Sequence, residues 1–326
     1  MPANVESMFS VREMPWHREG TVLDDYPQTW DEARKYAGLE WDPVEGPVFT
    51  RTPDGNLVEV PDWRAITRGE GGRVLACTKD SYAVITHTAF GEIFEAVLET
   101  DRNALKAETG GELEGGRKVW MLIKLDEPIM LPGDTSPSMP YLALTSRHDS
   151  MGGCVLRATA VRIVCANTFG AAEMEGQRTG ATFTFIHRTS WRDRIEEARN
   201  AVTGARKQFA DYADLMSRLT GVKVTAEQTE LFVKAFIPSP PESMISDRVA
   251  KNIETARQAV RTIIASPTVE GAGVRGTAYG LVQAAGEYLD HSRKARSWET
   301  KMNRTLLTQE PLKAKAVKLA LQAANA

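Results

Sequence analysis

Apolar and polar positions follow two different periods along the chain. From about residue 45 to residue 187, short runs alternate between apolar and polar side chains, which is typical of half-buried strands. After Ser190 the apolar positions recur at helical spacing instead. The predicted strands cover residues 48–52, 57–60, 74–78, 82–86, 104–112, 118–125, 141–146, 155–165 and 182–187. The predicted helices cover residues 29–37, 88–99, 225–236, 246–265, 276–291 and 312–324, with a further long helix that begins near Trp191.

The order of these elements predicts the fold class. Strands come first and helices last, which favours an α+β protein over an alternating α/β protein. We expect a mostly antiparallel, twisted sheet with one or two packed helices, followed by an all-helical C-terminal region. The predicted segments are an N-terminal arm and helix at 1–44, a sheet domain at 45–187 and a helical region packed on the sheet at 188–326.

Turn and cap residues mark the element boundaries. The run Pro53-Asp54-Gly55-Asn56 is typical of a hairpin turn, and Leu113-Glu114-Gly115-Gly116 is typical of a second one. Thr29 and Thr88 each precede an apolar helical run, so both are predicted N-caps. Asn167 or Thr168 is predicted to cap a further short helix.

Composition limits the class of protein. Hydrophobic residues make up 42% of the 326 residues and charged residues 25%, which are the values of a soluble globular chain. The N-terminus has no apolar leader, and no apolar run is long enough to span a membrane. The cysteines are Cys77, Cys154 and Cys165, and this sparse, odd count favours a reducing cytoplasm over a disulfide framework.

The net charge of −3 conceals an asymmetry between the two ends of the chain. Residues 188–326 contain 22 Lys and Arg against 15 Asp and Glu, a balance of +7, which leaves −10 for residues 1–187. A basic half indicates either contact with nucleic acid or simply the solvated surface of helices. The sequence leaves both interpretations open.

One central stretch, Thr145 to Asn167, concentrates polar and reactive side chains. Its first part is polar, and its second part is a β-prone run in which a cysteine is more often a small core residue. We expect exposed function in the first part and core packing in the second. The residues that define the stretch are Ser146, Arg147, His148, Asp149, Ser150, Cys165 and Asn167.

Four groups of residues carry a resemblance to a known family. They are Pro15-Trp16-His17 with Gly20, Thr29-Trp30 with Ala37-Gly38-Leu39, Ser146 and His148-Asp149-Ser150 with Val161–Thr168, and Gly276–Gly280 with Glu287–His291. These groups resemble the phage/plasmid-like family built on a bacterial domain of unknown function (number nine-three-two). The resemblance implies a gene carried on a phage, prophage or plasmid and a protein of the bacterial cytoplasm. It implies no activity, because the family has none established.

Two kinds of catalytic site are compatible with the central stretch. Cys165 with His148 and Asn167 has the residue types of a cysteine nucleophile, its base and an orienting group. His148-Asp149 has the residue types of a metal site, although no two histidines show zinc-site spacing. The alternatives are a core cysteine and a hydrogen-bonded loop pair, which we favour, so no metal and no cofactor are predicted.

A third kind of site, a phosphate-binding loop, is rejected. Residues 271–276 match the spacing G-x-G-x-x-G and precede a predicted helix. A dinucleotide loop also requires a strand before the glycines and an acidic residue about twenty positions after them. Neither is present, so these glycines are predicted to permit close packing.

Basic side chains in the central strands are candidates for contacting nucleic acid. Cations on a curved sheet neutralise phosphates, and Trp120 and Tyr141 are aromatics available to stack on bases. A second basic patch lies at Arg293-Lys294-Ala295-Arg296 with Lys301 and Arg304. Each patch alone is also compatible with a solvated face. The six candidate contacts in the strands are Arg117, Lys118, Lys124, Arg147, Arg157 and Arg162.

The function predicted from these observations is DNA binding without catalysis. The order of hairpin, strand and helix at 104–175 is also found in phage single-strand annealing proteins, which is an analogy of fold only. We therefore expect a self-associating protein of replication or recombination that contacts DNA, in particular single strands. The alternatives are a cysteine- or metal-dependent hydrolase, and a protein that binds a host partner or counters host defence.

Overall fold

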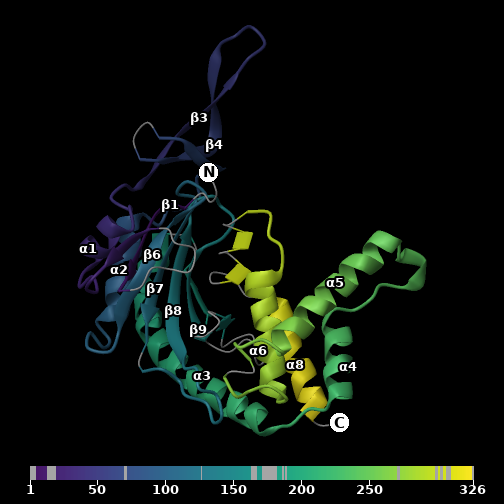
Figure 1. Ribbon diagram of the computed structural model, residues 1–326. Coiled ribbons are helices and arrows are strands. Elements are labelled where there is room, and N and C mark those ends of the chain that lie inside the picture. The colour runs from purple at the N-terminus through teal and green to yellow at the C-terminus, as the bar shows by residue number, and fades with distance from the viewer. Residues whose placement is uncertain are drawn as a thin grey trace. The chain divides into compact units, whose positions relative to one another are not determined.

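The computed structural model confirms the predicted α+β class, with mostly antiparallel sheets and a helical C-terminal region (Figure 1). It describes residues 5–12, 20–69, 72–125, 127–162, 167–170, 182–185, 187, 189–269, 272–297, 300–301, 304–305 and 310–324. The strands are β1 (Val5–Val11), β2 (Thr21–Leu23), β3 (Pro43–Arg51), β4 (Leu57–Arg68), β5 (Val74–Lys79), β6 (Lys106–Leu113), β7 (Lys118–Lys124), β8 (Ser138–Arg147), β9 (Cys154–Arg162), β10 (Asn167–Gly170) and β11 (Thr182–Phe185). The α-helices are α1 (Trp30–Tyr36), α2 (His87–Leu98), α3 (Ile195–Gly221), α4 (Ala226–Phe236), α5 (Asp247–Ile264), α6 (Ala278–Glu287) and α8 (Pro311–Ala324).

The chain forms two compact units, and neither is a continuous stretch of sequence. Unit 1 contains Met1–Asp126, Leu142–Arg157 and Gly180–Gly204, and unit 2 contains Glu127–Tyr141, Ala158–Thr179 and Ala205–Ala326. Strands β8 and β9 and helix α3 each contribute residues to both units. The segment boundaries predicted at residues 44 and 187 stay a prediction. Within the described ranges, no helix combines the length and the apolar character that crossing a lipid bilayer requires.

Unit 1 is organised around the larger sheet. The strand order across the hydrogen bonds is β9-β8-β7-β6-β1-β2, and β11 also pairs with β9. The predicted hairpin of residues 104–125 is confirmed as β6 and β7, with Leu113 opposite Lys118. Its turn residues Glu114, Gly115 and Gly116 have φ values of +58°, +67° and +87°. Glycine adopts this left-handed backbone without steric cost, which explains the turn sequence.

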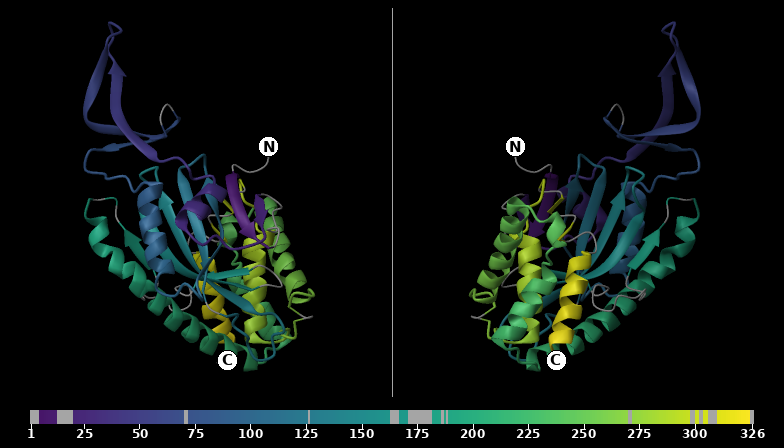
Figure 2. Two further views of the ribbon diagram at one scale, coloured as in Figure 1. Left: turned by 90° about the vertical axis from the view of Figure 1, so that its left-hand side faces the viewer. Right: turned by 90° about the vertical axis from the view of Figure 1, so that its right-hand side faces the viewer.

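A second sheet in unit 1 consists of β3, β4 and β5 in that order. The predicted turn is confirmed, because Arg51 pairs with Leu57 across it. The hairpin is longer than predicted, and its register changes between Pro47 and Phe49. The outer part of the hairpin extends clear of the rest of unit 1 (Figures 1 and 2).

Residues 82–86 were predicted to form a strand, and that prediction is wrong. The segment is irregular and ends at Thr86, the N-cap of α2. One of its backbone hydrogen bonds is made with a residue distant in the sequence, because Ala83 donates its N–H to the carbonyl of His187 (3.1 Å). The predicted N-cap Thr88 instead donates its hydroxyl to Asp42 (2.8 Å).

The helix α2 and its neighbour α1 cover part of the unit 1 core. Phe90 and Phe94 of α2 are fully buried, and the indole ring of Trp30 from α1 lies 5.3 and 5.4 Å from their rings. Burial of three large aromatic rings is a major stabilising contribution, on the order of several kcal/mol. Thr29 caps α1 as predicted, since its hydroxyl accepts the N–H of Glu32 (3.3 Å).

Unit 2 is mainly helical. Helix α4 begins with a capping box in which Thr225 and Gln228 bond reciprocally, and α5 begins at the N-cap Ser246. Helix α6 is almost fully buried and continues into a π-helical turn, Tyr288–Ser292. The helix start predicted at Asn167 or Thr168 is wrong, because β10 begins there and runs antiparallel to β9, with Asn167 opposite Arg162.

Candidate functional site

A buried pair of histidines lies beneath the central polar cluster of unit 1. His148, directly after β8, and His87, the first residue of α2, are both fully buried. Their Nε2 atoms are 3.1 Å apart, and Nδ1 of His87 lies 3.3 Å from the carbonyl oxygen of Leu39. A carbonyl only accepts, so His87 carries its proton on Nδ1, and its Nε2 accepts the Nε2–H of His148. Nδ1 of His148 has no hydrogen-bond partner among the described residues.

Both imidazoles are held in the neutral form. Burial lowers the pKa of His87 to about 4, although the carboxylate of Asp42 opposes this shift. Burial also lowers the pKa of His148 well below its ordinary value, and the neighbouring His87 and His187 add to the effect. Two buried rings joined by one hydrogen bond at neutral pH are an element of packing, since neither imidazole reaches solvent.

A third buried histidine, His187, lies in the same region as the histidine pair. His187 is buried, and its ring stacks on Tyr82 with the ring centres 4.4 Å apart. Its Nδ1 lies 3.1 Å from the carbonyl of Ala83 and 3.3 Å from the N–H of Ile85, so the tautomer decides which of the two it bonds. Burial lowers the pKa of His187 as well.

The carboxylate of Asp149 forms an ion pair with Arg147 and no hydrogen bond with the histidine pair. The carboxylate of Asp149 accepts from Nε of Arg147 (2.9 Å), from a second nitrogen of that guanidinium and from the N–H of Met151 (3.0 Å). Burial opposes ionisation, but these hydrogen bonds prevail and lower the pKa of Asp149. Arg147 also lies 3.6 Å from Glu114, so the predicted loop contains an ion-pair network. Ser150 follows with φ +62° and is exposed.

Arginines from separate elements surround the β6–β7 turn. Arg68 of β4 pairs with the buried carboxylate of Glu112 (2.7 Å), and Nη2 of Arg73 donates to the carbonyl of Glu114 (2.6 Å). Arg147, the last residue of β8, approaches the same turn. Arg117 directly follows the turn in the sequence and is exposed. We call this group, Arg68, Arg73, Arg117 and Arg147, the turn arginines.

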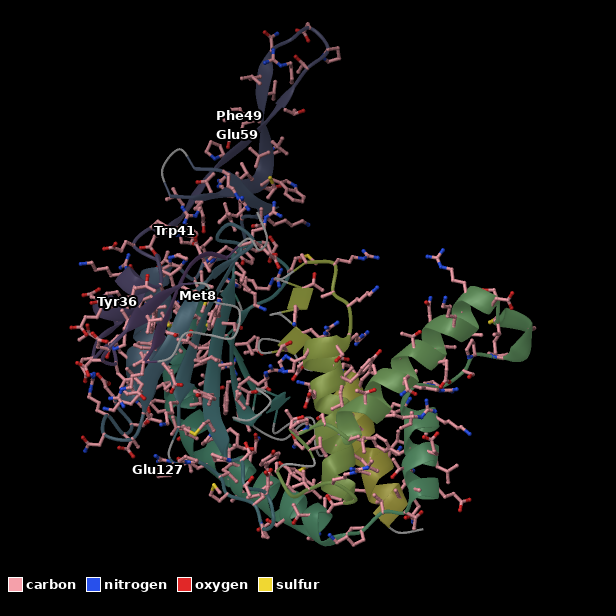
Figure 3. All side chains as sticks on the ribbon, viewed as in Figure 1. Met8, Tyr36, Trp41, Phe49, Glu59 and Glu127 are labelled. Carbon is pink, nitrogen blue, oxygen red and sulfur yellow. The ribbon has the colours of Figure 1, made fainter. Side chains whose placement is uncertain are left out.

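Trp41, labelled in Figure 3, contacts Arg68 of the turn arginines and His87 of the histidine pair. Its indole N–H donates to Glu112 (3.1 Å), and the guanidinium of Arg68 lies 4.5 Å from the indole ring centre. Trp41 also contacts His87, and the two ring centres are 4.3 Å apart in an edge-on arrangement. A Cβ added to Gly116 would lie 2.5 Å from the Trp41 ring, so glycine is required there.

The comparisons with known proteins identify a family. The family model described as "Domain of unknown function (DUF932)" matches residues 74–309, which is more than half of the chain. The chain belongs to the DUF932 family. No curated protein and no solved structure matches the chain. The DUF932 match begins at Val74, so the β3–β4 hairpin, Trp41 and Arg68 lie outside it.

The other basic residues predicted as nucleic-acid contacts in the DUF932 domain are placed differently. Lys118 and Arg157 are buried, and Lys124 is half-buried. Burial lowers the pKa of Lys118 to about 7, and the nearby Arg147 acts in the same direction. The side chain of Arg162 lies outside the described residues. These assignments stay a prediction, and of the five whose side chains the structure describes only Arg117 is exposed.

The catalytic and metal alternatives within the DUF932 domain have no assembled site in the described residues. Cys165 lies outside them, and of Asn167 only the backbone is described. Ser146 is buried beside Cys154, where burial raises the pKa of the thiol. In the described part of the chain, no group of three or more His, Cys, Asp and Glu side chains is arranged to hold a metal ion.

Sequence reasoning missed the residues that connect this region. Trp41 comes from the loop before β3, and Arg68, Glu112 and His87 come from three separate elements. None of the four stands in a motif with His148. The one available signal was chemical, since tryptophan, histidine and arginine are costly to leave without partners in a core. That signal indicates participation in a network, but it does not indicate which residues are partners.

Proposed function

We propose that this DUF932 protein binds single-stranded DNA through the turn arginines, without catalysis, in the replication or recombination of a phage or another mobile element in the bacterial cytoplasm. We also propose that it self-associates. The observation that carries the proposal is the convergence of the turn arginines on one turn of unit 1. Planar guanidinium groups are the side chains best suited to bind phosphates in two-point contacts.

Charge supports this reading of the turn. The four turn arginines face three carboxylates, those of Glu112, Glu114 and Asp149, so the group retains a net positive charge. The carboxylates fix the directions of Arg68 and Arg147 before any ligand arrives. Among the described residues, Arg117 forms no ion pair, and its exposed guanidinium is available to a phosphate. Contacts of this kind release counterions and weaken as salt rises.

Two exposed aromatic side chains lie on β3 and β4, and β4 is the strand that ends at Arg68. Trp63 lies five residues before Arg68 on this strand and is partly exposed. Phe49 on the paired strand β3 is exposed as well. Aromatic faces beside cationic groups are the usual means of binding single strands without sequence preference, because every base can stack. The proposed substrate is therefore single-stranded DNA of any sequence.

The test is fluorescence anisotropy of a labelled oligothymidine at about 50 to 200 mM salt, where electrostatic binding changes most. We expect the logarithm of the binding constant to fall linearly with the logarithm of salt. Arg117→Ala and Arg73→Ala should each reduce that slope by about 0.7, the value for one phosphate contact on a single strand. Arg192→Ala, an exposed arginine paired with Glu92 in the same unit, is the matched control. Absence of binding at low salt, or equal losses in all three variants, would remove the proposal.

A further inference from the structure

The second basic patch of the sequence connects α6 to α8 within unit 2, at the yellow end of the chain in Figure 1. Residues 290–313 contain six Lys and Arg against three Asp and Glu, a balance of +3. The stretch begins inside the π-helical turn Tyr288–Ser292. Turns of this kind are rare and are frequently found at functional sites. The proposed function does not use this patch, so its excess charge requires a separate explanation.

Two ion pairs within unit 2 fix the ends of this stretch. The ammonium of Lys313 and the carboxylate of Asp290 form a pair that is hidden from solvent (2.9 Å). Arg293 forms a pair with the buried carboxylate of Glu310 (3.1 Å). The backbone N–H of Arg293 also donates to the carbonyl of Tyr288 (2.7 Å), which holds this arginine directly after the π-helical turn. Both carboxylates that the structure describes in this stretch are therefore already paired with a cation.

Arg304 brings a further positive charge to Arg293. Its Nη2 donates to the carbonyl of Arg293 (3.1 Å), whereas its Nε is buried and has no hydrogen-bond partner among the described residues. Burial lowers the pKa of Arg304, and the positive charge of Arg293 adds to the effect. Burial also lowers the pKa of Lys301, and the positive charge of Arg304 acts in the same direction. Arg304 is thus a half-buried guanidinium that two neighbouring cations repel.

Tyr288 adds a hydroxyl group to these three cations. Burial raises the pKa of Tyr288, and the positive charges of Arg293 and Arg304 oppose the rise, so both guanidinium groups act on this side chain. The ring of Tyr288 contacts Phe236 of α4, with the ring centres 6.3 Å apart. Guanidinium, ammonium and hydroxyl groups are all donors, and together they are the groups that bind phosphate oxygens in proteins.

We infer that Arg293, Lys301 and Arg304, together with the hydroxyl of Tyr288, bind one phosphate group in unit 2. The three cations and the carboxylate of Glu310 sum to +2, and a phosphate group at neutral pH carries a charge of about −1.5 to −2. A phosphate oxygen can accept the hydrogen bond that Nε of Arg304 lacks, and the negative charge offsets the repulsion among the cations. The inference depends neither on the turn arginines, which belong to unit 1, nor on DNA binding.

The experiment is isothermal titration calorimetry of the full chain with inorganic phosphate, in a buffer without other phosphate and without nucleic acid. We expect one phosphate to bind per chain. Arg304→Gln and Lys301→Gln should each weaken binding at least about tenfold, the effect of losing one hydrogen bond to a charged group. Arg248→Gln/Lys251→Gln removes two exposed cations of α5 in the same unit, and this matched control should bind phosphate as the wild type does.

The source of the phosphate group is distinguished by the anisotropy experiment with labelled oligothymidine. If the site takes free phosphate or a nucleotide, Arg304→Gln leaves the salt dependence of oligothymidine binding unchanged. If the site takes a phosphate of the strand, the slope falls by about 0.7.

Circular dichroism establishes that each variant is folded, and Lys301→Gln tests the site if Arg304→Gln does not fold. The inference is overturned if the wild type binds neither phosphate nor oligothymidine, or if the folded site variants bind both as the wild type does. An equal loss in the Arg248→Gln/Lys251→Gln control overturns it as well. Failure of the turn-arginine variants alone removes the proposed function and leaves this phosphate site standing.

Discussion

The histidine pair makes the stability of unit 1 depend on pH in a way that can be measured. We consider the double variant His87→Gln/His148→Gln. A glutamine amide both donates and accepts, so the pair can still hydrogen-bond, but it no longer titrates. His291→Gln in unit 2 is the control, since it removes a histidine outside the cluster.

The magnitude follows from the lowered pKa values. Burial lowers the pKa of His87 from 6.5 to about 4, and each pKa unit corresponds to about 1.4 kcal/mol. The unfolded chain binds a proton in this interval and the folded chain does not. Stability is therefore complete above pH 6.5 and is lost as the pH falls toward 4, by about 3 kcal/mol for His87 alone. The pKa of His148 is lowered in the same direction, so the pair gives a steeper slope than His87 alone, which contributes about 1.2 kcal/mol per pH unit near pH 5.

The assay is urea unfolding at a series of pH values from about 5 to 7.5, the interval in which the unfolded histidines titrate. Tryptophan fluorescence reports on unit 1, because six of the seven tryptophans belong to it. We expect the free energy of unfolding of the wild type and of His291→Gln to fall more steeply below pH 6.5 than that of the double variant. Carboxylates contribute equally to all three. Equal slopes would refute the buried neutral pair.

Three further predictions concern other buried groups. Iodoacetamide should alkylate the exposed Cys77 of the native protein and leave Cys154 unmodified, because burial raises the pKa of the Cys154 thiol. Peptide mass mapping measures the labelling of each cysteine, and equal labelling of the two would contradict this. Asp290→Ala should destabilise the protein by about 3 to 5 kcal/mol in urea unfolding, because it leaves the buried ammonium of Lys313 without its 2.9 Å ion pair, whereas Asp290→Leu/Lys313→Met should recover most of the loss. Burial lowers the pKa of Lys118 to about 7, so above this pH the unfolded chain binds a proton that the folded chain does not. The melting temperature of the wild type should therefore rise relative to that of Lys118→Met between about pH 7 and 9. Parallel plots of melting temperature against pH would contradict this.

The local pattern of the sequence was sufficient where local chemistry decides the structure. The β6–β7 hairpin was predictable because Gly115 and Gly116 occupy left-handed backbone positions between two alternating runs. Helix α2 was predictable because Phe90 and Phe94 recur at helical spacing and are buried as expected. In both cases the partners lie within a few residues of each other.

The strand predicted at residues 82–86 failed because its partner is distant. Tyr82 and Val84 have the alternating pattern of a strand, but the carbonyl of His187 accepts the N–H of Ala83 and its ring stacks on Tyr82. The candidate site failed to emerge for the same reason. His87 and His148 are 61 residues apart, and their contact depends on a helix start meeting a strand end. No period in the sequence contains that information.

The division of unit 1 among three segments has a consequence for synthesis on the ribosome. After Asp126 is made, 78 more residues must follow before Gly204 completes the unit. At about 5 to 20 residues per second, this takes about 4 to 16 s. Early in that interval, before β8 has been made, strand β7 has an unpaired edge. The core also lacks Trp191, which is buried in the folded protein. The nascent chain is thus exposed to pairing with other chains, and we expect its yield in cells to depend on translation speed and on chaperones that shield open strand edges.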